Sequence, residues 1–166
     1  MINKNELEIE RKFLIRMPDI ALIESQNGCK KVDIEQTYLL DRTRIRRWNE
    51  DNKTVFIKTF KEKINELVRI EKESEISKEE YDALLISKDP DRNTISKTRY
   101  RFPFAKKLIE VDIFPFWNDR AFLEIELESE DDNFEIPPFI ELIKEVTFDK
   151  RYRNSALAKE IPNDEI

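Results

Sequence analysis

The residues with the clearest chemical potential are two glutamates and a lysine that alternate near the N-terminus, in the string Glu8-Ile9-Glu10-Arg11-Lys12. If the string is a β-strand, its period of two places Glu8, Glu10 and Lys12 on one face. Neighbouring carboxylates on a strand face are about 7 Å apart and repel each other. We therefore predict that this face holds a cation or an ionic ligand that the acids share.

The same alternation of charged and apolar residues recurs along the chain, and the charges are sorted by sign. Residues of one sign share a strand face as follows: Arg44 with Arg46; Lys97 with Arg99 and Arg101; Glu8 with Glu10; Glu71 with Glu73; Glu110 with Asp112; and Glu124 with Glu126. In an ordinary antiparallel sheet each charged face meets water, but a face tuned for solubility intersperses the two signs. The sorting favours a site where metal ions meet a polyanion.

The composition excludes several common kinds of active site. The 166 residues include no histidine and one glycine, Gly28. The chain therefore lacks a histidine base, a histidine zinc ligand and a Ser–His or Cys–His pair, and it has no glycine-rich phosphate loop. The single cysteine, Cys29, is interpreted as a packing residue. Chemistry must rest on carboxylates, lysine, arginine, tyrosine and bound metal.

Charge and hydrophobicity bound the class of protein. The chain is 40% charged but also 39% hydrophobic with 11 phenylalanines, so we expect it to fold, as one domain spanning residues 1–166. The net charge of −6 argues against a nucleic-acid partner. No apolar run reaches the length of a signal peptide or a membrane span. These features predict a cytoplasmic protein without nucleic-acid or membrane partners.

The periodicity predicts a mainly β protein with added helices, in the α+β class. Strands are expected at residues 8–15, 31–40, 44–48, 54–61, 66–76, 94–102, 107–114 and 121–129. Helices are expected at residues 20–24, from a capping box at 77–80 to just before Pro90, at 137–144 and at 150–160. Eight antiparallel strands close into a barrel without exposed edges. Because most strands have one apolar face, we predict a charged interior and an apolar exterior covered by helices.

Two lysines compete for the interior in the strand expected at 54–61. One face carries Thr59 and Lys61, and the other carries Phe56, Lys58 and Phe60. We prefer Lys61 because its neighbours are less bulky, while a register slip of one residue would place Lys58 inside instead.

A triphosphate matches this combination of charges. Holding it requires several guanidinium and ammonium groups, and arginine supplies bidentate contacts to phosphate. Carboxylates are suitable hard ligands for Mg²⁺ or Mn²⁺, which would neutralise the acid pairs and bridge phosphate oxygens.

The chain resembles the CYTH superfamily, also called the triphosphate tunnel metalloenzymes. The Glu-x-Glu-x-Lys string near the N-terminus is that family's signature. The resemblance continues in Arg44-Ile45-Arg46, Thr59-Phe60-Lys61, Arg69-Ile70-Glu71-Lys72-Glu73, Lys97-Thr98-Arg99-Tyr100, Glu110-Val111-Asp112-Ile113-Phe114, Glu124-Ile125-Glu126 and Asp149-Lys150-Arg151-Tyr152-Arg153-Asn154. It covers almost the whole chain and is nearest to the small bacterial enzymes that hydrolyse inorganic triphosphate.

The resemblance implies an eight-stranded antiparallel tunnel with the triphosphate along its axis. By matching positions, Glu8, Glu10 and Glu126 would bind the principal Mg²⁺ or Mn²⁺, with Glu124 beside them. The phosphates would be held by Lys12, Arg44, Arg46, Lys61, Arg69, Lys97 and Arg99. Glu71, Glu73 and Asp112 would orient the attacking water, directly or through a second metal. The terminal helix near Tyr152 is expected to plug one mouth of the tunnel.

Other functions remain open at this point. Adenylate cyclases of the family typically carry a His-Phe segment, and this chain has no histidine. Thiamine triphosphatases position aromatic groups for the thiamine ring, a role for which Trp48 and Trp117 are candidates, although packing is the favoured interpretation of both. A non-catalytic polyphosphate-binding module needs the bases but not the four acid pairs. The physiological triphosphate, the preferred metal and the formation of a homodimer are left open.

Overall fold

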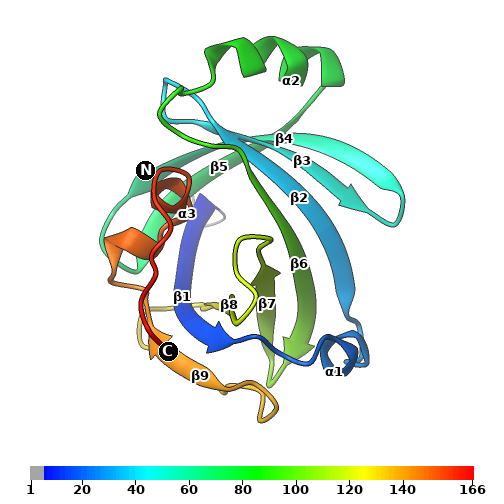
Figure 1. Ribbon diagram of the computed structural model, residues 1–166, viewed down its shortest axis with the longest axis vertical. Coiled ribbons are helices and arrows are strands. Elements are labelled where there is room, and N and C mark those ends of the chain that lie inside the picture. The colour runs from blue at the N-terminus through cyan, green and yellow to red at the C-terminus, as the bar shows by residue number, and fades with distance from the viewer. Residues whose placement is uncertain (1–5) are drawn as a thin grey trace.

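A closed antiparallel barrel of eight strands forms the centre of the computed structural model, which describes residues 6–166 (Figure 1). The strands are β1 (Leu7–Arg16), β2 (Lys30–Tyr38), β3 (Arg44–Glu50), β4 (Lys53–Lys63), β5 (Val68–Ile76), β6 (Ile95–Phe104), β7 (Lys107–Ile113) and β8 (Arg120–Glu126). Around the barrel they follow the order β5-β4-β3-β2-β6-β7-β8-β1, and β1 pairs with β5 to close it. The predicted fold, mainly β with added helices, is confirmed.

The first strand, β1, contacts three other strands. Residues 10–16 pair with β8 along one edge. Along the other edge residues 7–9 pair with β5, and residues 13–15 pair with a ninth strand, β9 (Leu142–Glu145), outside the barrel. The string that carries the two glutamates and the lysine therefore lies where the barrel closes.

The helix predicted at residues 137–144 is wrong. Residues 137–140 form a turn in which Ile140 N donates to Pro137 O over 2.9 Å, and β9 follows. Two adjacent prolines are compatible with the first turn of a helix but do not require one. Because β5 leaves the edge of β1 after residue 9, the backbone groups further along β1 need partners, and β9 supplies them.

Short helices occupy the connections. Asp19 caps α1 (Ile20–Glu24), and Ser77 Oγ accepts a hydrogen bond from Glu80 N at the start of α2 (Lys78–Leu84), which confirms both expected helix starts. A 3-10 turn, η2 (Leu85–Ser87), extends α2. No helix within residues 6–166 combines the length and the hydropathy needed to cross a bilayer.

The helix predicted at residues 150–160 is divided into η3 (Lys150–Tyr152) and α3 (Asn154–Leu157). Arg153 lies between them with extended backbone, φ −67° and ψ 142°. Two side-chain contacts favour the break: Tyr152 is fully buried, and Arg153 Nη2 lies 3.2 Å from Glu66 Oε2. A continuous helix was expected because periodicity does not reveal these contacts.

The main hydrophobic cluster covers the outside of β1, β6, β7 and β8. It includes Phe13, Phe102, Val111 and Leu123, with Ile23 of α1 packed against them. The irregular segment 134–140 covers the rest, so helices provide only part of the predicted cover.

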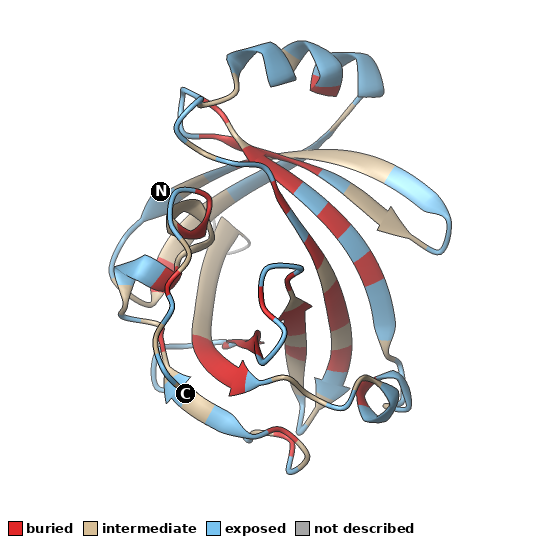
Figure 2. Cartoon of the chain, viewed as in Figure 1, coloured by how far each residue is buried: buried red, intermediate tan, exposed pale blue. Residues whose placement is uncertain are grey.

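Buried and exposed residues alternate along β2, as the bands in Figure 2 show. The buried residues of β2, Val32, Ile34 and Gln36, pair with Arg99, Lys97 and Arg46 and therefore face the interior, whereas the exposed residues between them face outward. The predicted apolar exterior is therefore confirmed on β1, β6, β7 and β8 and is wrong for β2.

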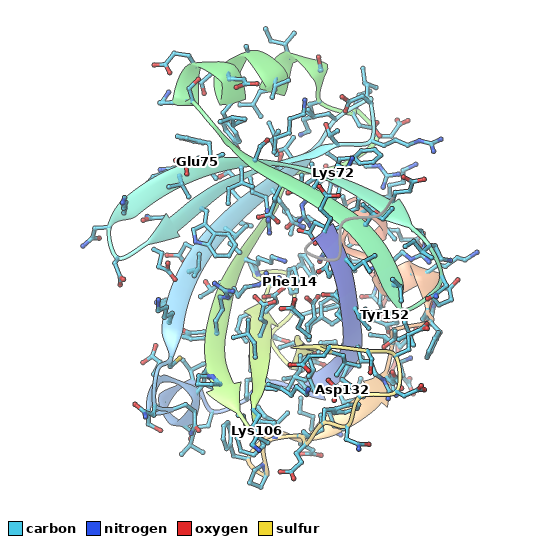
Figure 3. All side chains as sticks on the ribbon, turned by 180° about the vertical axis from the view of Figure 1, so that it is seen from behind. Lys72, Glu75, Lys106, Phe114, Asp132 and Tyr152 are labelled. Carbon is cyan, nitrogen blue, oxygen red and sulfur yellow. The ribbon has the colours of Figure 1, made fainter. Side chains whose placement is uncertain are left out.

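A second hydrophobic cluster fills one end of the barrel interior. Leu14 and Phe122 lie opposite each other on β1 and β8, and by the period of two they share the face of Lys12. Phe114, Trp117 and Tyr152 pack against them, and Phe114 and Tyr152 can be followed in Figure 3. Trp117 is only 7% exposed, so it is a packing residue. Hydrophobic side chains therefore close one end of the charged interior.

Candidate active site

Two cavities that share four residues form the charged interior. The first has a volume of about 620 Å³ and the second about 310 Å³. Glu10, Arg44, Lys61 and Asn154 line both, so the cavities meet at these residues. We refer to them as the first and second cavities of one tunnel.

Acidic side chains face each other across the strands that line the second cavity. Glu10 lies directly opposite Glu126, and Glu110 lies opposite Glu124. Burial raises the pKa of Glu10 well above its usual value, and the charges of Glu124 and Glu8 raise it further. Burial and the charge of Glu110 also raise the pKa of Glu126. Like charges placed directly opposite each other are destabilising, so this arrangement has a cost in the absence of a cation.

Lys61 lies between two further acids. Its Nζ is 2.9 Å from Glu8 Oε2 and 3.4 Å from Glu71 Oε2. Burial opposes ionisation of Glu8, but Lys61 and hydrogen bonds with neighbouring acids outweigh it and hold the pKa of Glu8 well below its usual range. Burial and hydrogen bonds with Glu8 and Glu73 raise the pKa of Glu71 to about 9. At neutral pH, Glu71 is therefore protonated while Glu8 is ionised.

Two basic side chains, Arg99 and Lys97, are held by one buried carboxylate, that of Asp112. Arg99 donates from Nε to Asp112 Oδ1 over 2.7 Å and from Nη2 to Oδ2 over 2.9 Å, a bidentate pair. Lys97 Nζ donates to the same Asp112 Oδ2 over 2.8 Å. Burial lowers the pKa of Lys97 to about 8 despite the attraction of Asp112. One buried carboxylate thus positions two bases.

Within residues 6–166, several buried polar groups in or beside the tunnel have no hydrogen-bond partner. Arg44 and Arg46 are 9% and 4% exposed, and the Nε atom of each lacks an acceptor. Thr59 Oγ1 and Gln36 Oε1, which come from the strands on either side, are also unsatisfied. Leaving a buried polar group unpaired costs about 1–3 kcal/mol. Burial lowers the pKa of Arg46 to about 10, and repulsion by Arg44 contributes. An anion that accepts from both guanidinium groups would remove the cost at the two Nε atoms.

A model of the CYTH domain matches residues 6–152. The chain belongs to the CYTH family.

Solved structures agree with this assignment. The inorganic triphosphatase NE1496 is 30% identical to this CYTH protein, covers 98% of each chain and has a TM-score of 0.58. Another structure of NE1496, described as a hypothetical protein, is 32% identical over 93% of this chain and 99% of its own, with a TM-score of 0.57. PH1819 from Pyrococcus horikoshii OT3 is 21% identical over 75% of this chain and 80% of its own, with a TM-score of 0.56, a likeness of fold alone. No curated protein matches the chain.

Twelve of the fourteen residues predicted for the site line one of the two cavities: Glu8, Glu10, Lys12, Arg44, Arg46, Lys61, Arg69, Glu71, Glu73, Arg99, Glu124 and Glu126. Lys97 and Asp112 line neither cavity, because they lie behind Arg99. Lys61 lies in the tunnel of this CYTH protein, whereas Lys58 has the opposite strand parity and lines neither cavity.

Other lining residues were missed or left unassigned in the sequence. Tyr38 and Thr59 line the first cavity, each directly opposite Arg44 on a neighbouring strand. The parity of Thr59 with Lys61 was the available signal, whereas Tyr38 and Asn154 required the fold. Trp48 lines the second cavity, where the guanidinium carbons of Arg46 and Arg101 lie 5.4 and 5.7 Å from its ring centroid.

The acids of this CYTH protein fit a divalent cation by chemistry. Within residues 6–166, no three acidic or cysteine side chains already converge on a point where a metal would bind. Glu8, Glu10 and Glu126 nevertheless supply the hard oxygen ligands that Mg²⁺ and Mn²⁺ prefer. A cation beside Glu10 and Glu126 would favour their ionised forms, because it would offset the burial and the neighbouring acidic charges that raise the pKa of each. The carboxylates therefore suit such an ion. To bind it, Glu8 and Glu10 would give up their contacts with Lys61 and Arg69.

Proposed function

We propose that this CYTH protein is a divalent-metal-dependent hydrolase that cleaves the terminal phosphoryl group of inorganic triphosphate, with nucleoside triphosphates as slower substrates. The observation that carries the proposal is the set of buried guanidinium donors without acceptors beside a cluster of repelling acids. A polyanion together with a divalent cation satisfies both at once. The 30% identity to the inorganic triphosphatase NE1496 over 98% of the chain supports it.

The phosphates are held by six of the seven basic residues that the sequence indicated: Lys12, Arg44, Arg46, Lys61, Arg69 and Arg99. Arg44 and Arg46 bind most directly, since their Nε atoms have no competing acceptor. Arg69 is held only weakly, with Nη1 3.7 Å from Glu10 Oε1, so a phosphate oxygen competes for it easily. Lys97 lies behind Arg99 and contributes its charge rather than a contact.

Glu8, Glu10 and Glu126 hold the cation, and Glu124 lies beside them. When bound, Mg²⁺ or Mn²⁺ neutralises the acids and polarises the phosphoryl oxygens that it contacts.

Glu73 is the residue best placed to accept a proton from the attacking water. A hydrogen bond from Glu71 and the charge of Arg46, 3.1 Å away, lower the pKa of Glu73, so it is ionised at neutral pH. The water oxygen attacks the terminal phosphorus in line, its proton passes to a carboxylate, and pyrophosphate leaves. Glu71 and Glu73 orient the water. The role predicted for Asp112 stays a prediction, and its contacts favour positioning of Arg99 and Lys97.

The test is phosphate release from tripolyphosphate, ATP and thiamine triphosphate, each with Mg²⁺, Mn²⁺ or excess chelator. We expect metal-dependent cleavage of tripolyphosphate to phosphate and pyrophosphate, with slower release from ATP. Formation of cyclic AMP from ATP would assign a cyclase instead. Tight tripolyphosphate binding without turnover would assign a binding module.

Single substitutions test the site itself. Arg44→Ala should raise the KM for tripolyphosphate, and Glu126→Gln should abolish metal-dependent turnover while the fold is retained. Arg47→Ala is the matched control, because Arg47 follows Arg46 in β3 but is exposed on the outer face. Wild-type kinetics in both site variants would show that the assignment is wrong.

A further inference from the structure

The two cavities of the tunnel differ in charge. Among the described residues, eight basic and three acidic side chains line the first cavity, whereas five basic and eight acidic side chains line the second. Acids that hold a cation are therefore concentrated in the second cavity, and bases that attract phosphate are concentrated in the first. A triphosphate whose reacting end lies beside the cation has its scissile bond near the junction of the two cavities.

An uncharged side chain, that of Asn154, lies at this junction. Asn154 lines both cavities, together with the charged residues Glu10, Arg44 and Lys61. The proposed reaction gives a role to each of the three charged residues but none to Asn154. A triphosphate that extends from one cavity into the other passes this amide.

One end of the Asn154 amide lacks a hydrogen-bond partner. Its Oδ1 atom is buried, and no donor within residues 6–166 reaches it. A buried polar atom without a partner is unfavourable, so such atoms in a site indicate a missing ligand. An asparagine amide carries an acceptor at one end and two donors at the other, and turning the amide over exchanges the two ends. In that orientation the buried position presents N–H donors to a phosphate oxygen.

The backbone on both sides of Asn154 is held in place. On one side Lys12 Nζ donates to Tyr152 O over 2.9 Å, and on the other Arg92 Nη1 donates to Ser155 O. These two bases come from β1 and from the loop before β6, so separate parts of the barrel fix the position of the amide. A donor that is already in position costs no reorganisation when charge develops on the substrate.

We propose that the Asn154 amide donates a hydrogen bond to the triphosphate at the scissile bond, on the pyrophosphate that leaves. The inference rests on the proposed hydrolase function and adds a substrate-contacting residue to it. Water forms a bond to the terminal phosphorus and gives one proton to a carboxylate, while the bond from that phosphorus to the bridging oxygen breaks and the oxygen leaves with pyrophosphate. Negative charge grows on the leaving group, so the donor stabilises the transition state more than the bound substrate.

The experiment measures kcat and KM for tripolyphosphate in wild type, Asn154→Ala and Asn154→Asp, and thermal unfolding checks that each variant is folded. Because Asn154→Ala loses one hydrogen bond to a charged group, we expect its kcat to fall about 10- to 100-fold, with a smaller rise in KM. Asn154→Asp keeps the size of the side chain but has no N–H donor, and its charge repels phosphate. Its kcat/KM should therefore be lower still.

Asn93→Ala is the matched control. Asn93 is exposed and lines neither cavity, but its backbone N donates to Ala158 O of the same C-terminal segment over 2.8 Å. The substitution is the same and the backbone contact is kept, so this variant should retain wild-type kinetics.

Two results would overturn the proposal while the hydrolase function stands. One is a wild-type kcat in Asn154→Ala. The other is activity that Asn154→Ala loses and Asn154→Asp recovers, because a carboxylate has no N–H to donate. If calorimetry then shows tighter Mg²⁺ binding in Asn154→Asp, the amide oxygen contacts the cation instead.

If wild type binds tripolyphosphate without hydrolysing it, the proposed function fails, but the contact is still tested by calorimetric binding of tripolyphosphate in excess chelator. A Kd that rises in Asn154→Ala and rises further in Asn154→Asp supports the contact. Equal Kd values in wild type and Asn154→Ala overturn it.

Discussion

Lys12 Nζ donates a hydrogen bond of 2.9 Å to the carbonyl oxygen of Tyr152, which joins the first strand to a residue 140 positions later. The same ammonium group lies 3.5 Å from Glu124 Oε1 and 4.0 Å from the ring centroid of Phe122. A phosphate-binding base is thus positioned by the C-terminal segment. The stability of that segment and the affinity for substrate are therefore linked.

Tyr152→Ala should reduce both stability and substrate affinity. The ring is fully buried, and its centroid lies 6.0 Å from that of Phe122. Removing such a ring costs about 3–5 kcal/mol. Urea unfolding and the KM for tripolyphosphate are the measurements. Tyr152→Phe keeps the ring and loses only the 2.6 Å hydrogen bond to Asp164, so it should cost about 1 kcal/mol. Equal losses in the two variants would contradict the packing role.

Mg²⁺ without substrate should stabilise the protein through Glu10. Attraction to the cation offsets the charges of Glu124 and Glu8 that raise the pKa of Glu10, so the melting temperature should rise with added Mg²⁺. At a hundredfold excess over Kd the gain is about 2.7 kcal/mol. Glu10→Gln should lose most of this rise, as differential scanning calorimetry would show. Glu141→Gln, at an exposed acid, is the control. A full rise in Glu10→Gln would place the cation elsewhere.

Substrate affinity should fall above pH 8 because of Lys97. Burial lowers the pKa of Lys97 to about 8, so its charge is present below that pH and is lost as the pH rises through it. The loss of one positive charge behind Arg99 weakens attraction for the phosphates. We expect kcat/KM for tripolyphosphate to decline above about pH 8, whereas the decline in kcat comes at higher pH, because bound phosphate favours the protonated lysine. Lys97→Gln should show a higher KM at pH 7 and no such decline. If the kcat/KM of Lys97→Gln still declines above about pH 8, Lys97 is not the cause of the decline.

Ser77→Ala should destabilise the protein without affecting catalysis. Ser77 Oγ caps α2 by accepting from Glu80 N over 3.0 Å, and Ser77 is not among the residues that line either cavity. Loss of such a cap costs about 1 kcal/mol. Chemical unfolding and steady-state kinetics measure the two effects, and Ser96→Ala, at an exposed serine of β6, is the control. A change in the KM for tripolyphosphate in Ser77→Ala would show that α2 affects substrate binding in the tunnel.

Much of the barrel follows from the period of two. Because successive residues alternate between faces, Glu8, Glu10 and Lys12 could be assigned together to one side, and the structure places all three along the tunnel. Periodicity does not fix the depth of a residue along the barrel axis, however. Asp112 has the same parity as Glu110, yet only Glu110 lines a cavity, because Asp112 lies behind Arg99.

Other features depended on contacts between distant segments. Nothing local distinguishes residues 142–145 as a strand, since β9 forms because β1 has a free edge there. Tyr38 and Asn154 enter the site through the arrangement of β2 against β3 and the break at Arg153. These features are properties of the assembled barrel, and a single strand or helix does not contain them.

Within residues 6–166, the joint between β1 and β5 has three residue pairs, fewer than any other joint around the barrel. Glu8 and Arg69, one proposed for the cation and one for phosphate, are the middle pair of that joint. A ligand that bridges these two side chains therefore adds a link where the described part of the barrel has the fewest paired residues. Ligand binding then stabilises the pairing of β1 with β5. Amide hydrogens on both sides of the joint should therefore exchange with solvent more slowly once the ligand is bound.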